Sequence, residues 1–376
     1  MRIGVPKEIK REERRVGLTP ASVDELVRAG HAVCVETGAG DAIGEPDDAY
    51  RAAGARIVAD ADAVFEAGEL IVKVKEPQAI ERARLRPHHT LFTYLHLAPD
   101  REQTKDLVAS GALCIAYETV TDASGGLPLL APMSRVAGRL AIQAGATSLE
   151  ARHGGAGVLL GGVPGVPAAR VVVLGGGVVG TNAIQMALGL GADVTVVDRS
   201  VRVLEGLAAR FGPALRTVFP TGASIEEQVL GADLVVGAVL VKGAAAPHLV
   251  TRDMVRRMKR GAVLVDVAID QGGCFETSRP TTHTEPTYVV DGVVHYCVAN
   301  MPGAVPRTAT QALNHATLPF VQALAGRGVN KALSTDPHLR NGLNVARGQV
   351  TEPAVAATHG YDYVDPILAL ESAWQG

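Results

Sequence analysis

Two lysines interrupt a run of residues that otherwise has the composition of a buried strand. The run LIVKVKEP spans residues 70–77, and Lys73 and Lys75 alternate in it with valines. Alternation in a strand places both side chains on one face, and a buried ammonium group is costly unless it is paired or acts on a ligand. Lys75 ends the predicted strand, so it could meet an anion or a carbonyl oxygen, or its head could reach water. No role for Lys73 follows from the sequence.

The next apolar run carries a second pair of polar side chains. In TYLHLAP, residues 93–99, Tyr94 and His96 share one face near the end of a predicted strand. An imidazole titrates near neutral pH, which suits proton transfer, although a lone histidine is often structural. Because the carboxyl ends of parallel strands border the ligand site in open α/β sheets, His96 is predicted to lie beside Lys75.

Two further residues could take part in the same chemistry. Arg15 follows the first predicted strand in REERRVGLTP, and a guanidinium can bind a carboxylate through two hydrogen bonds. From the residues alone, a solvated run of charges is the favoured interpretation of this segment. Asp270 follows a later strand, where it could assist water or proton handling or merely cap a turn.

A glycine motif gives the most specific signal of the sequence. In VVVLGGGVVG, residues 171–180, Gly175, Gly177 and Gly180 fit the pattern GxGxxG after an apolar strand and before a helix, and Asp198 ends the next strand. These glycines permit a tight turn, a close approach to a pyrophosphate and close packing of helix on strand. Asp198 would accept hydrogen bonds from ribose hydroxyls and repel a 2′-phosphate. The motif therefore predicts binding of NAD rather than NADP.

The elements that position these residues alternate between strand and helix along most of the chain. This alternation predicts an α/β fold with two doubly wound parallel-sheet, Rossmann-like domains. Residues 131–307 are predicted to form a dinucleotide-binding domain inserted into a discontinuous substrate domain, residues 1–130 plus 308–376, whose last part is helical and irregular. The length of 376 residues allows two cores, and a net charge of −3 without a basic stripe argues against nucleic acid or an anionic membrane as partner.

The cysteines and the first residues bear on location and on metals. The four cysteines are far apart and form no CxxC pair, and the chain opens without a secretory signal pattern. We therefore expect reduced thiols, a cytoplasmic protein and no metal site.

Several long motifs resemble the family of L-alanine dehydrogenases and transhydrogenase NAD-binding subunits. They are GVPKEIK, VKVKEP, LFTYLHLA, PMSRVAGR, GGGVVGTNA and DQGGCFETSRPTTH. The resemblance implies reversible oxidation of L-alanine with NAD and water to pyruvate, ammonium and NADH. It also implies a homo-oligomer, a hexamer in most members.

The resemblance further implies roles for individual positions. His96 and Asp270 match the catalytic residues, and Arg15 and Lys75 match the substrate-binding pair, to which we add Tyr94 and Asn300. The cofactor-contacting positions implied are Ser134, Gly175, Gly177, Val178, Val179, Gly180, Asp198, Val239, Leu240, Val267, Ala268, Ile269, Asp270, Val298, Ala299, Asn300 and Met301. The sequence departs from the family pattern at Val203, where members often carry a lysine a few residues after the ribose-binding aspartate. This departure bears on cofactor affinity and on how strictly the protein prefers NAD to NADP.

Three other functions fit parts of the pattern. They are the NAD(H)-binding subunit of a proton-translocating transhydrogenase, an opine or saccharopine-type dehydrogenase, and an inactive NAD sensor. The presence of both Lys75 and His96, together with the run DQGGCFETSRPTTH, favours an alanine dehydrogenase. Because a methylene or hydroxyl changes discrimination by only ~10–200-fold, side activities on other small amino acids are expected.

Overall fold

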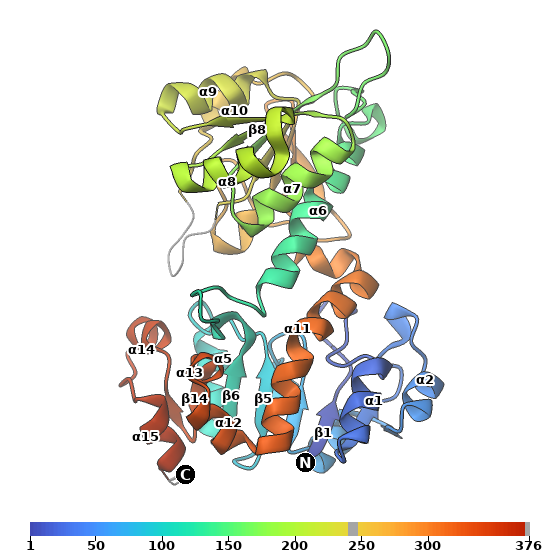
Figure 1. Cartoon of the computed structure of the whole chain (residues 1–376), viewed down its shortest axis with the longest axis vertical. Coiled ribbons are helices and arrows are strands. Elements are labelled where there is room, and N and C mark those ends of the chain that lie inside the picture. The colour runs from blue at the N-terminus through green and yellow to red at the C-terminus, as the bar shows by residue number, and fades with distance from the viewer. Residues whose placement is uncertain (240–246, 373–376) are drawn as a thin grey trace. The chain divides into compact units, whose positions relative to one another are not determined.

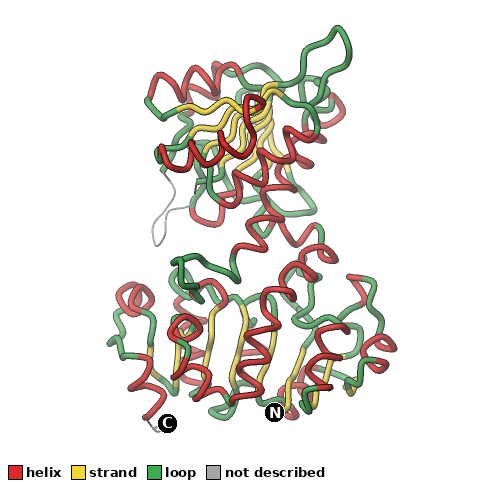
Figure 2. The backbone as a smooth tube through the Cα atoms, in the orientation of Figure 1, coloured by secondary structure: helices red, strands yellow, loops and turns green. Residues whose placement is uncertain are grey.

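The chain forms two compact units, each built on one twisted sheet with helices packed over it (Figures 1 and 2). The structure, a computed structural model, describes residues 1–239 and 247–372. Unit 1 comprises Met1–Met133 and Val305–Gly376, and unit 2 comprises Ser134–Ala304. The domain ranges predicted from the sequence are 1–130 plus 308–376 and 131–307.

Unit 1 contains an eight-stranded sheet in the order β15-β14-β6-β5-β4-β1-β2-β3. The strands from β6 to β3 are parallel, whereas β14 runs antiparallel to β6 and to β15. The strands are β1 (Arg2–Val5), β2 (Ala32–Glu36), β3 (Arg56–Val58), β4 (Leu70–Val72), β5 (Thr90–Thr93), β6 (Leu113–Ala116), β14 (Leu343–Ala346) and β15 (Gln349–Val350). The chain winds outward from β1 to β3 and returns to β4, so the order reverses between β1 and β4.

Ten α-helices lie wholly within the described part of unit 1, and Figure 1 shows α11 lying across one face of its sheet. They are α1 (Pro20–Arg28), α2 (Asp47–Ala52), α3 (Ala61–Ala67), α4 (Ala79–Arg82), α5 (Arg101–Ser110), α11 (Pro306–Arg327), α12 (Val329–Thr335), α13 (Pro337–Arg340), α14 (Pro353–His359) and α15 (Pro366–Glu371). Helix α1 illustrates the local signals: Thr19 accepts a hydrogen bond from the Ser22 amide as N-cap, and Pro20 occupies the first turn.

Unit 2 contains a seven-stranded sheet in the order β12-β13-β11-β10-β7-β8-β9, in which only β12 is antiparallel to its neighbour among the described strands. The strands are β7 (Arg170–Leu174), β8 (Asp193–Val197), β9 (Leu215–Val218), β10 (Leu234–Gly237), β11 (Val263–Asp266), β12 (Thr287–Val290) and β13 (Val293–Tyr296). The helices are α6 (Ala131–Ser148), which begins in unit 1, α7 (Val178–Gly189), α8 (Val201–Phe211), α9 (Gly222–Gly231) and α10 (Arg252–Arg257).

The fold class is the predicted α/β class with two parallel-dominated sheets, but several elements differ from expectation. Strands β4 and β5 end at Val72 and Thr93 rather than at residues 75 and 97. The C-terminal part contributes β14 and β15 to the sheet and is therefore not only helical and irregular. Strand β3 has only three residues, too few to form the apolar run by which a strand is recognised in a sequence.

Two absences hold for residues 1–239 and 247–372. No helix there has the length and apolarity needed to cross a membrane. Nor do three or more His, Cys, Asp or Glu side chains in these ranges gather in a way that could hold a metal ion. The four cysteines are buried as free thiols.

Candidate active site

Charged residues of the first unit, among them the predicted Arg15 and Lys75, gather where its strand order reverses. The loop after β1 carries Glu8, Glu13 and Arg15, and the segment after the neighbouring β4 carries Lys73 and Lys75. In open α/β sheets the carboxyl ends of strands at such a reversal form the usual ligand site.

Lys73 is fully buried and is paired with two carboxylates. Its Nζ lies 3.2 Å from Glu8 Oε2 and 2.6 Å from Glu81 Oε1. Burial acts to lower the pKa of the Lys73 ammonium, but the two carboxylates outweigh this effect and raise it. Burial raises the pKa of the Glu8 carboxyl, and Lys73 only partly offsets that rise. Lys73 is thus an internal cation, and its presence in an apolar run is explained by two buried carboxylates that the fold brings to it.

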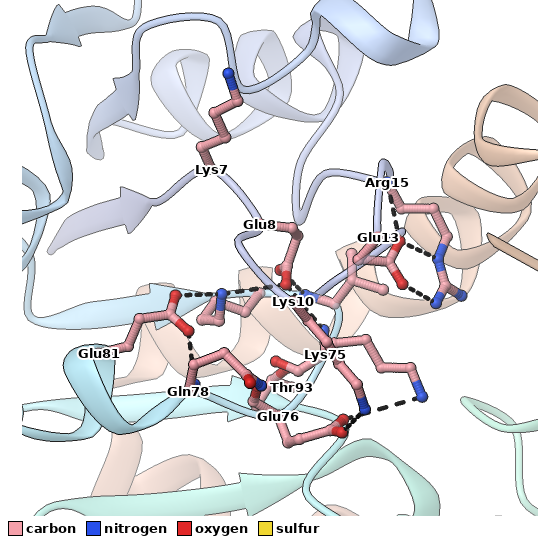
Figure 3. A network of polar contacts seen from close by, with 12 residues as sticks. Lys7, Glu8, Lys10, Glu13, Arg15, Lys75, Glu76, Gln78, Glu81 and Thr93 are labelled. Carbon is pink, nitrogen blue, oxygen red and sulfur yellow. Dashed lines mark hydrogen bonds and ion pairs between the residues drawn. The ribbon is translucent and has the colours of Figure 1, made fainter. Parts of the chain in front are cut away.

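Lys75 lies in a different environment from Lys73. Its side chain is 12% exposed, and its Nζ lies 3.9 Å from Glu76 Oε2, whose carboxylate also forms an ion pair with Lys10 (Figure 3). Because the strand ends at Val72, the argument that both lysines share one face of a strand does not apply. The segment nevertheless remains beside the next one: the Tyr94 amide donates to the Val74 carbonyl at 3.2 Å.

Arg15 is buried rather than part of a solvated charge run, which corrects the interpretation favoured by the residues alone. Its Nε donates to Glu13 Oε1 at 2.7 Å and its Nη2 to Glu13 Oε2 at 2.5 Å, a two-bond pairing that Figure 3 shows. Nη1 lies 3.0 Å from Met133 Sδ. Burial acts to lower the pKa of the guanidinium, but its hydrogen bonds to Glu13 and the charge of that residue raise it. Arg15 therefore stays charged in a buried position.

His96 follows β5 in a backbone conformation that few residues adopt. Its φ is 49°, in the left-handed region, and its side chain is 44% exposed. Glu118 Oε1 accepts the His96 amide at 2.6 Å and lies 3.8 Å from His96 Nδ1. The Tyr94 ring stacks parallel to the imidazole at 5.8 Å, and its hydroxyl donates to the Leu129 carbonyl. Burial raises the pKa of that phenol, so Tyr94 stays protonated.

The glycine motif of unit 2 has the geometry that its pattern predicts. A Cβ on Gly180 would lie 1.8 Å from the Gly175 carbonyl oxygen, and Gly175 has a φ of 100°. A Cβ on Gly177, the N-cap of α7, would meet nothing within 4 Å. Close packing therefore requires glycine at position 180, and the tight turn requires it at position 175. Gly177 leaves space in front of the N-terminus of α7.

Asp198 lies directly after β8 and holds the glycine turn. Its Oδ2 accepts the Gly176 amide at 2.7 Å, and its Oδ1 accepts the Ser200 amide at 2.8 Å. Since a carboxylate has about four acceptor positions, each oxygen can accept a further hydrogen bond. Val203 lies beside the same turn, with its Cγ1 2.7 Å from where a Cβ on Gly176 would lie. An apolar side chain thus lies beside this turn.

The remaining predicted cofactor positions follow the strands beside β7. Val239 comes after β10, and a Cβ on Gly175 would lie 3.2 Å from it; Leu240 lies outside the described residues. Val267, Ala268, Ile269 and Asp270 form a single 3₁₀ turn after β11, with Asp270 exposed. Val298, Ala299, Asn300 and Met301 follow β13, and Asn300 has a φ of 58°. Ser134 lies on α6, and Val178 and Val179 open α7.

The structure thus brings Arg15, Lys75, Tyr94 and His96 to one edge of the first sheet and the glycine motif, Asp198 and Val239 to one edge of the second. Sequence reasoning missed the carboxylates that hold these residues, namely Glu8, Glu13, Glu81 and Glu118. The one available signal was the lysine in an apolar run, since a buried cation implies a buried anion. Asp266, also missed as a structural residue, is fully buried and accepts the Cys274 amide at 2.8 Å; burial raises its pKa.

Comparison with known proteins shows to which family the chain belongs. The chain matches the family models "Alanine dehydrogenase/PNT, N-terminal domain" over residues 4–137 and "Alanine dehydrogenase/PNT, C-terminal domain" over residues 141–353. It is 63% identical over 365 residues to an alanine dehydrogenase of Halomonas elongata, covering 97% of this chain and 98% of that protein. It is 53% identical over 372 residues to an alanine dehydrogenase of Bacillus subtilis, covering 99% and 98%.

Solved structures give the same result at the level of the fold. A solved L-alanine dehydrogenase superimposes with a TM-score of 0.93 at 54% identity, covering 96% of this chain and 99% of that one. A transhydrogenase from Sinorhizobium meliloti superimposes with a TM-score of 0.81 at 27% identity, covering 93% and 100%. The two family models, the identities over nearly the whole chain and these superpositions all lead to one assignment: this chain belongs to the alanine dehydrogenase/PNT family.

Proposed function

We propose that the protein is an NAD-dependent L-alanine dehydrogenase. The reaction is L-alanine + NAD⁺ + H₂O ⇌ pyruvate + NH₄⁺ + NADH + H⁺. The observation that carries the proposal is 63% identity, over 97% of the chain, to a protein named alanine dehydrogenase. The cation pair Arg15 and Lys75 and the nearby imidazole of His96 supply groups of the kind that this substrate needs.

The residues of unit 1 are assigned to the substrate. Arg15, held charged by Glu13, binds the carboxylate of alanine or pyruvate. Lys75 contacts the carbonyl oxygen of pyruvate and stabilises negative charge on that oxygen as it develops. His96 gives and takes the proton at the substrate nitrogen or oxygen. Tyr94 completes the substrate contacts assigned to unit 1. Asn300 and Asp270 belong to unit 2, and the family resemblance assigns Asn300 to substrate binding and Asp270 to the orientation of water or ammonia.

The dinucleotide is assigned to unit 2, whose residues fit it. The open space at Gly177, in front of the α7 amides, suits a pyrophosphate, and Asp198 retains acceptor capacity for the ribose hydroxyls. When bound, NAD supplies the hydride acceptor. The carboxylate of Asp198 disfavours a 2′-phosphate, so we propose NAD over NADP. The positions from Ser134 to Met301 that resemble the family's cofactor contacts are assigned to NAD as a set.

The test is absorbance at the NADH band with purified protein, NAD and a panel of L-amino acids near pH 10. We expect rapid NADH formation with L-alanine, and loss of NADH with pyruvate that depends on ammonium. NADH binding without turnover on any amino acid would contradict the proposal and favour a transhydrogenase subunit or an NAD sensor. Turnover that requires lysine or glutamate together with a keto acid would favour a saccharopine-type enzyme.

We also propose, on the family resemblance, a cytoplasmic homo-oligomer with six subunits. Sedimentation equilibrium of the purified chain measures the subunit number directly. A monomer at micromolar concentration would contradict this assembly without affecting the proposed reaction.

A further inference from the structure

We propose that Glu8 is a positioning residue that fixes the backbone from which Lys75 extends. The inference deepens the proposed function, because it rests on the assignment of Lys75 to the substrate oxygen. Glu8 follows β1 and Lys75 follows β4, so the carboxylate links the two loops on either side of the strand reversal.

The contacts of Glu8 are of two kinds. Its Oε1 accepts the Val74 amide at 2.7 Å, and its Oε2 accepts the Lys75 amide at 3.4 Å. The same Oε2 accepts from Lys73 Nζ at 3.2 Å. Two successive backbone amides beyond the end of β4 therefore donate to one buried side chain, as Figure 3 shows for Glu8 and the segment of Lys75. The Glu8 carboxyl group thus accepts from the amides of Val74 and Lys75 as the carbonyl groups of a neighbouring strand would do within a sheet.

Lys73 orients the Glu8 carboxylate toward these amides. The ammonium lies between Glu8 and Glu81, and all three side chains are at most 2% exposed. A buried ion pair of this kind contributes little net stability but holds a specific geometry when every hydrogen bond is made. Lys73 is thus given a role: its ammonium group holds the Glu8 carboxyl group in place beside the amides of Val74 and Lys75.

Glu81 provides a matched comparison within the same cluster. It shares Lys73 with Glu8 and is equally buried, but it accepts the Gln78 amide at 2.8 Å instead of those of Val74 and Lys75. Removing either carboxylate leaves Lys73 paired with the other. Both changes therefore disturb the buried ion pairs to a similar degree, and only a change at Glu8 releases the backbone of Lys75.

The experiment compares Glu8→Ala and Glu8→Gln with Glu81→Ala and Glu81→Gln in the full chain. The first measurement is deuterium exchange of the amides at residues 73–76 by mass spectrometry. The second is KM for pyruvate, kcat, the Kd for NADH and Tm. Because a lost hydrogen bond is worth roughly a factor of ten in local opening, we expect Glu8→Ala to speed exchange at the amides of Val74 and Lys75 about tenfold or more.

In the same variant we expect KM for pyruvate to rise about tenfold or more, the scale of a misplaced substrate contact, with the Kd for NADH unchanged. Glu8→Gln should have an intermediate effect, because its amide oxygen can still accept the Val74 N–H. If Glu8→Ala does not fold, the exchange rates and KM of Glu8→Gln test the proposal instead. Glu81→Ala should lower Tm by a similar amount but leave exchange at residues 73–76 and KM within about twofold.

Equal kinetic and exchange effects from the Glu8 and Glu81 variants at matched Tm would overturn the proposal, since both would then act through stability alone. Unchanged exchange in Glu8→Ala would overturn it as well. If the wild-type protein does not use pyruvate, the proposed function fails, while the exchange comparison still decides whether Glu8 holds the backbone of Lys75.

Discussion

His96 combines an unusual backbone conformation with a side chain suited to proton transfer. A non-glycine residue with positive φ is held by its surroundings, and here Glu118 accepts its amide. The same carboxylate accepts the Leu95 amide at 3.2 Å. Glu118 therefore holds two successive backbone amides, those of Leu95 and His96. Such a backbone conformation is typical of a side chain that must hold one orientation, as the proposed role of His96 requires.

We expect His96→Ala and His96→Asn to lower kcat on the order of 100- to 10,000-fold, the usual contribution of a general acid or base. The Kd for NADH should change little, because the dinucleotide is assigned to unit 2. Steady-state kinetics and fluorescence titration with NADH measure the two quantities. Asparagine adopts the left-handed region readily, so it separates loss of the imidazole from backbone strain. Wild-type turnover in His96→Asn would contradict the assignment.

His89 shows how a buried imidazole links stability to pH. Its Nδ1 accepts the Arg86 amide at 2.9 Å, and its Nε2 donates to the Phe65 carbonyl at 2.8 Å, an arrangement that requires the neutral ring. Burial lowers the pKa of His89 to about 4. The unfolded chain, with a pKa of about 6.5, takes up the proton first as the pH falls. Stability is therefore fully present above about pH 6.5 and is lost as the pH falls toward 4.

We expect the wild-type protein to lose about 2 kcal/mol of unfolding free energy through this residue between pH 8 and pH 5. His89→Asn, which does not titrate and keeps an acceptor for the Arg86 amide, should show a correspondingly smaller loss. Urea denaturation at the two pH values measures the difference. His153→Asn, at an exposed position outside this cluster, is the control. An identical pH dependence in His89→Asn and the wild type would show that His89 is not responsible.

At the scale of elements, the turn from β7 into α7 depends on the absence of a side chain at Gly180. A Cβ there would lie 1.8 Å from a backbone oxygen, and backbone can shift only at a cost. We expect Gly180→Ala to destabilise the protein by about 1–3 kcal/mol through overpacking and to weaken NADH binding. Thermal unfolding and NADH titration measure both effects.

The control is a glycine in the next helix. Gly206 lies within α8, is exposed, and a Cβ there would meet nothing within 4 Å. We expect Gly206→Ala to stabilise the protein by about 0.5–1 kcal/mol, because alanine favours the helix, and to leave NADH binding unchanged. If the two substitutions had the same sign, close packing at Gly180 would not be the reason for its glycine.

The glycine turn could be predicted from the sequence because its requirements are local. The fingerprint, its strand, its helix and Asp198 fall within a single segment, 171–198. The pairing of Lys73 with Glu8 could not be predicted in this way, because Glu8 stands 65 positions away and only the fold brings it near. The predicted strand ends at residues 75 and 97 were wrong for the same reason: β4 and β5 end at Val72 and Thr93, although the apolar pattern continues. Beyond these ends, the amides of Val74 and His96 donate to the distant side chains of Glu8 and Glu118.

At the scale of the whole molecule, unit 1 is assembled from both ends of the chain. Strand β14 pairs with β6, and Asn314 on α11 binds the loop after β1. The amide of Thr19 donates to Asn314 Oδ1 at 2.8 Å, and Asn314 Nδ2 donates to the Gly17 carbonyl at 3.2 Å. Unit 2, in contrast, is one continuous segment with its own core, which includes Leu174, Val235 and Leu264.

This difference predicts how the two units behave when separated. We expect the fragment 134–304 to unfold cooperatively and to bind NADH with a Kd close to that of the full chain, because its sheet and glycine motif are complete. The fragment 1–133 lacks β14 and α11, so its sheet edge and the loop after β1 lose their partners, and we expect it to be unfolded. Near-ultraviolet circular dichroism and NADH titration measure these outcomes.

Joining residue 133 to residue 305 through a short glycine-serine linker should restore a cooperative fold, since both parts of unit 1 are then present. Replacing Asn314 by alanine in that linked protein should cost about 1–3 kcal/mol, because buried donors and acceptors of the loop after β1 lose their partner. A fragment 1–133 that folds alone would show that unit 1 does not need the C-terminal segment in order to fold. A fragment 134–304 that fails to bind NADH would show that the cofactor site needs residues of both units.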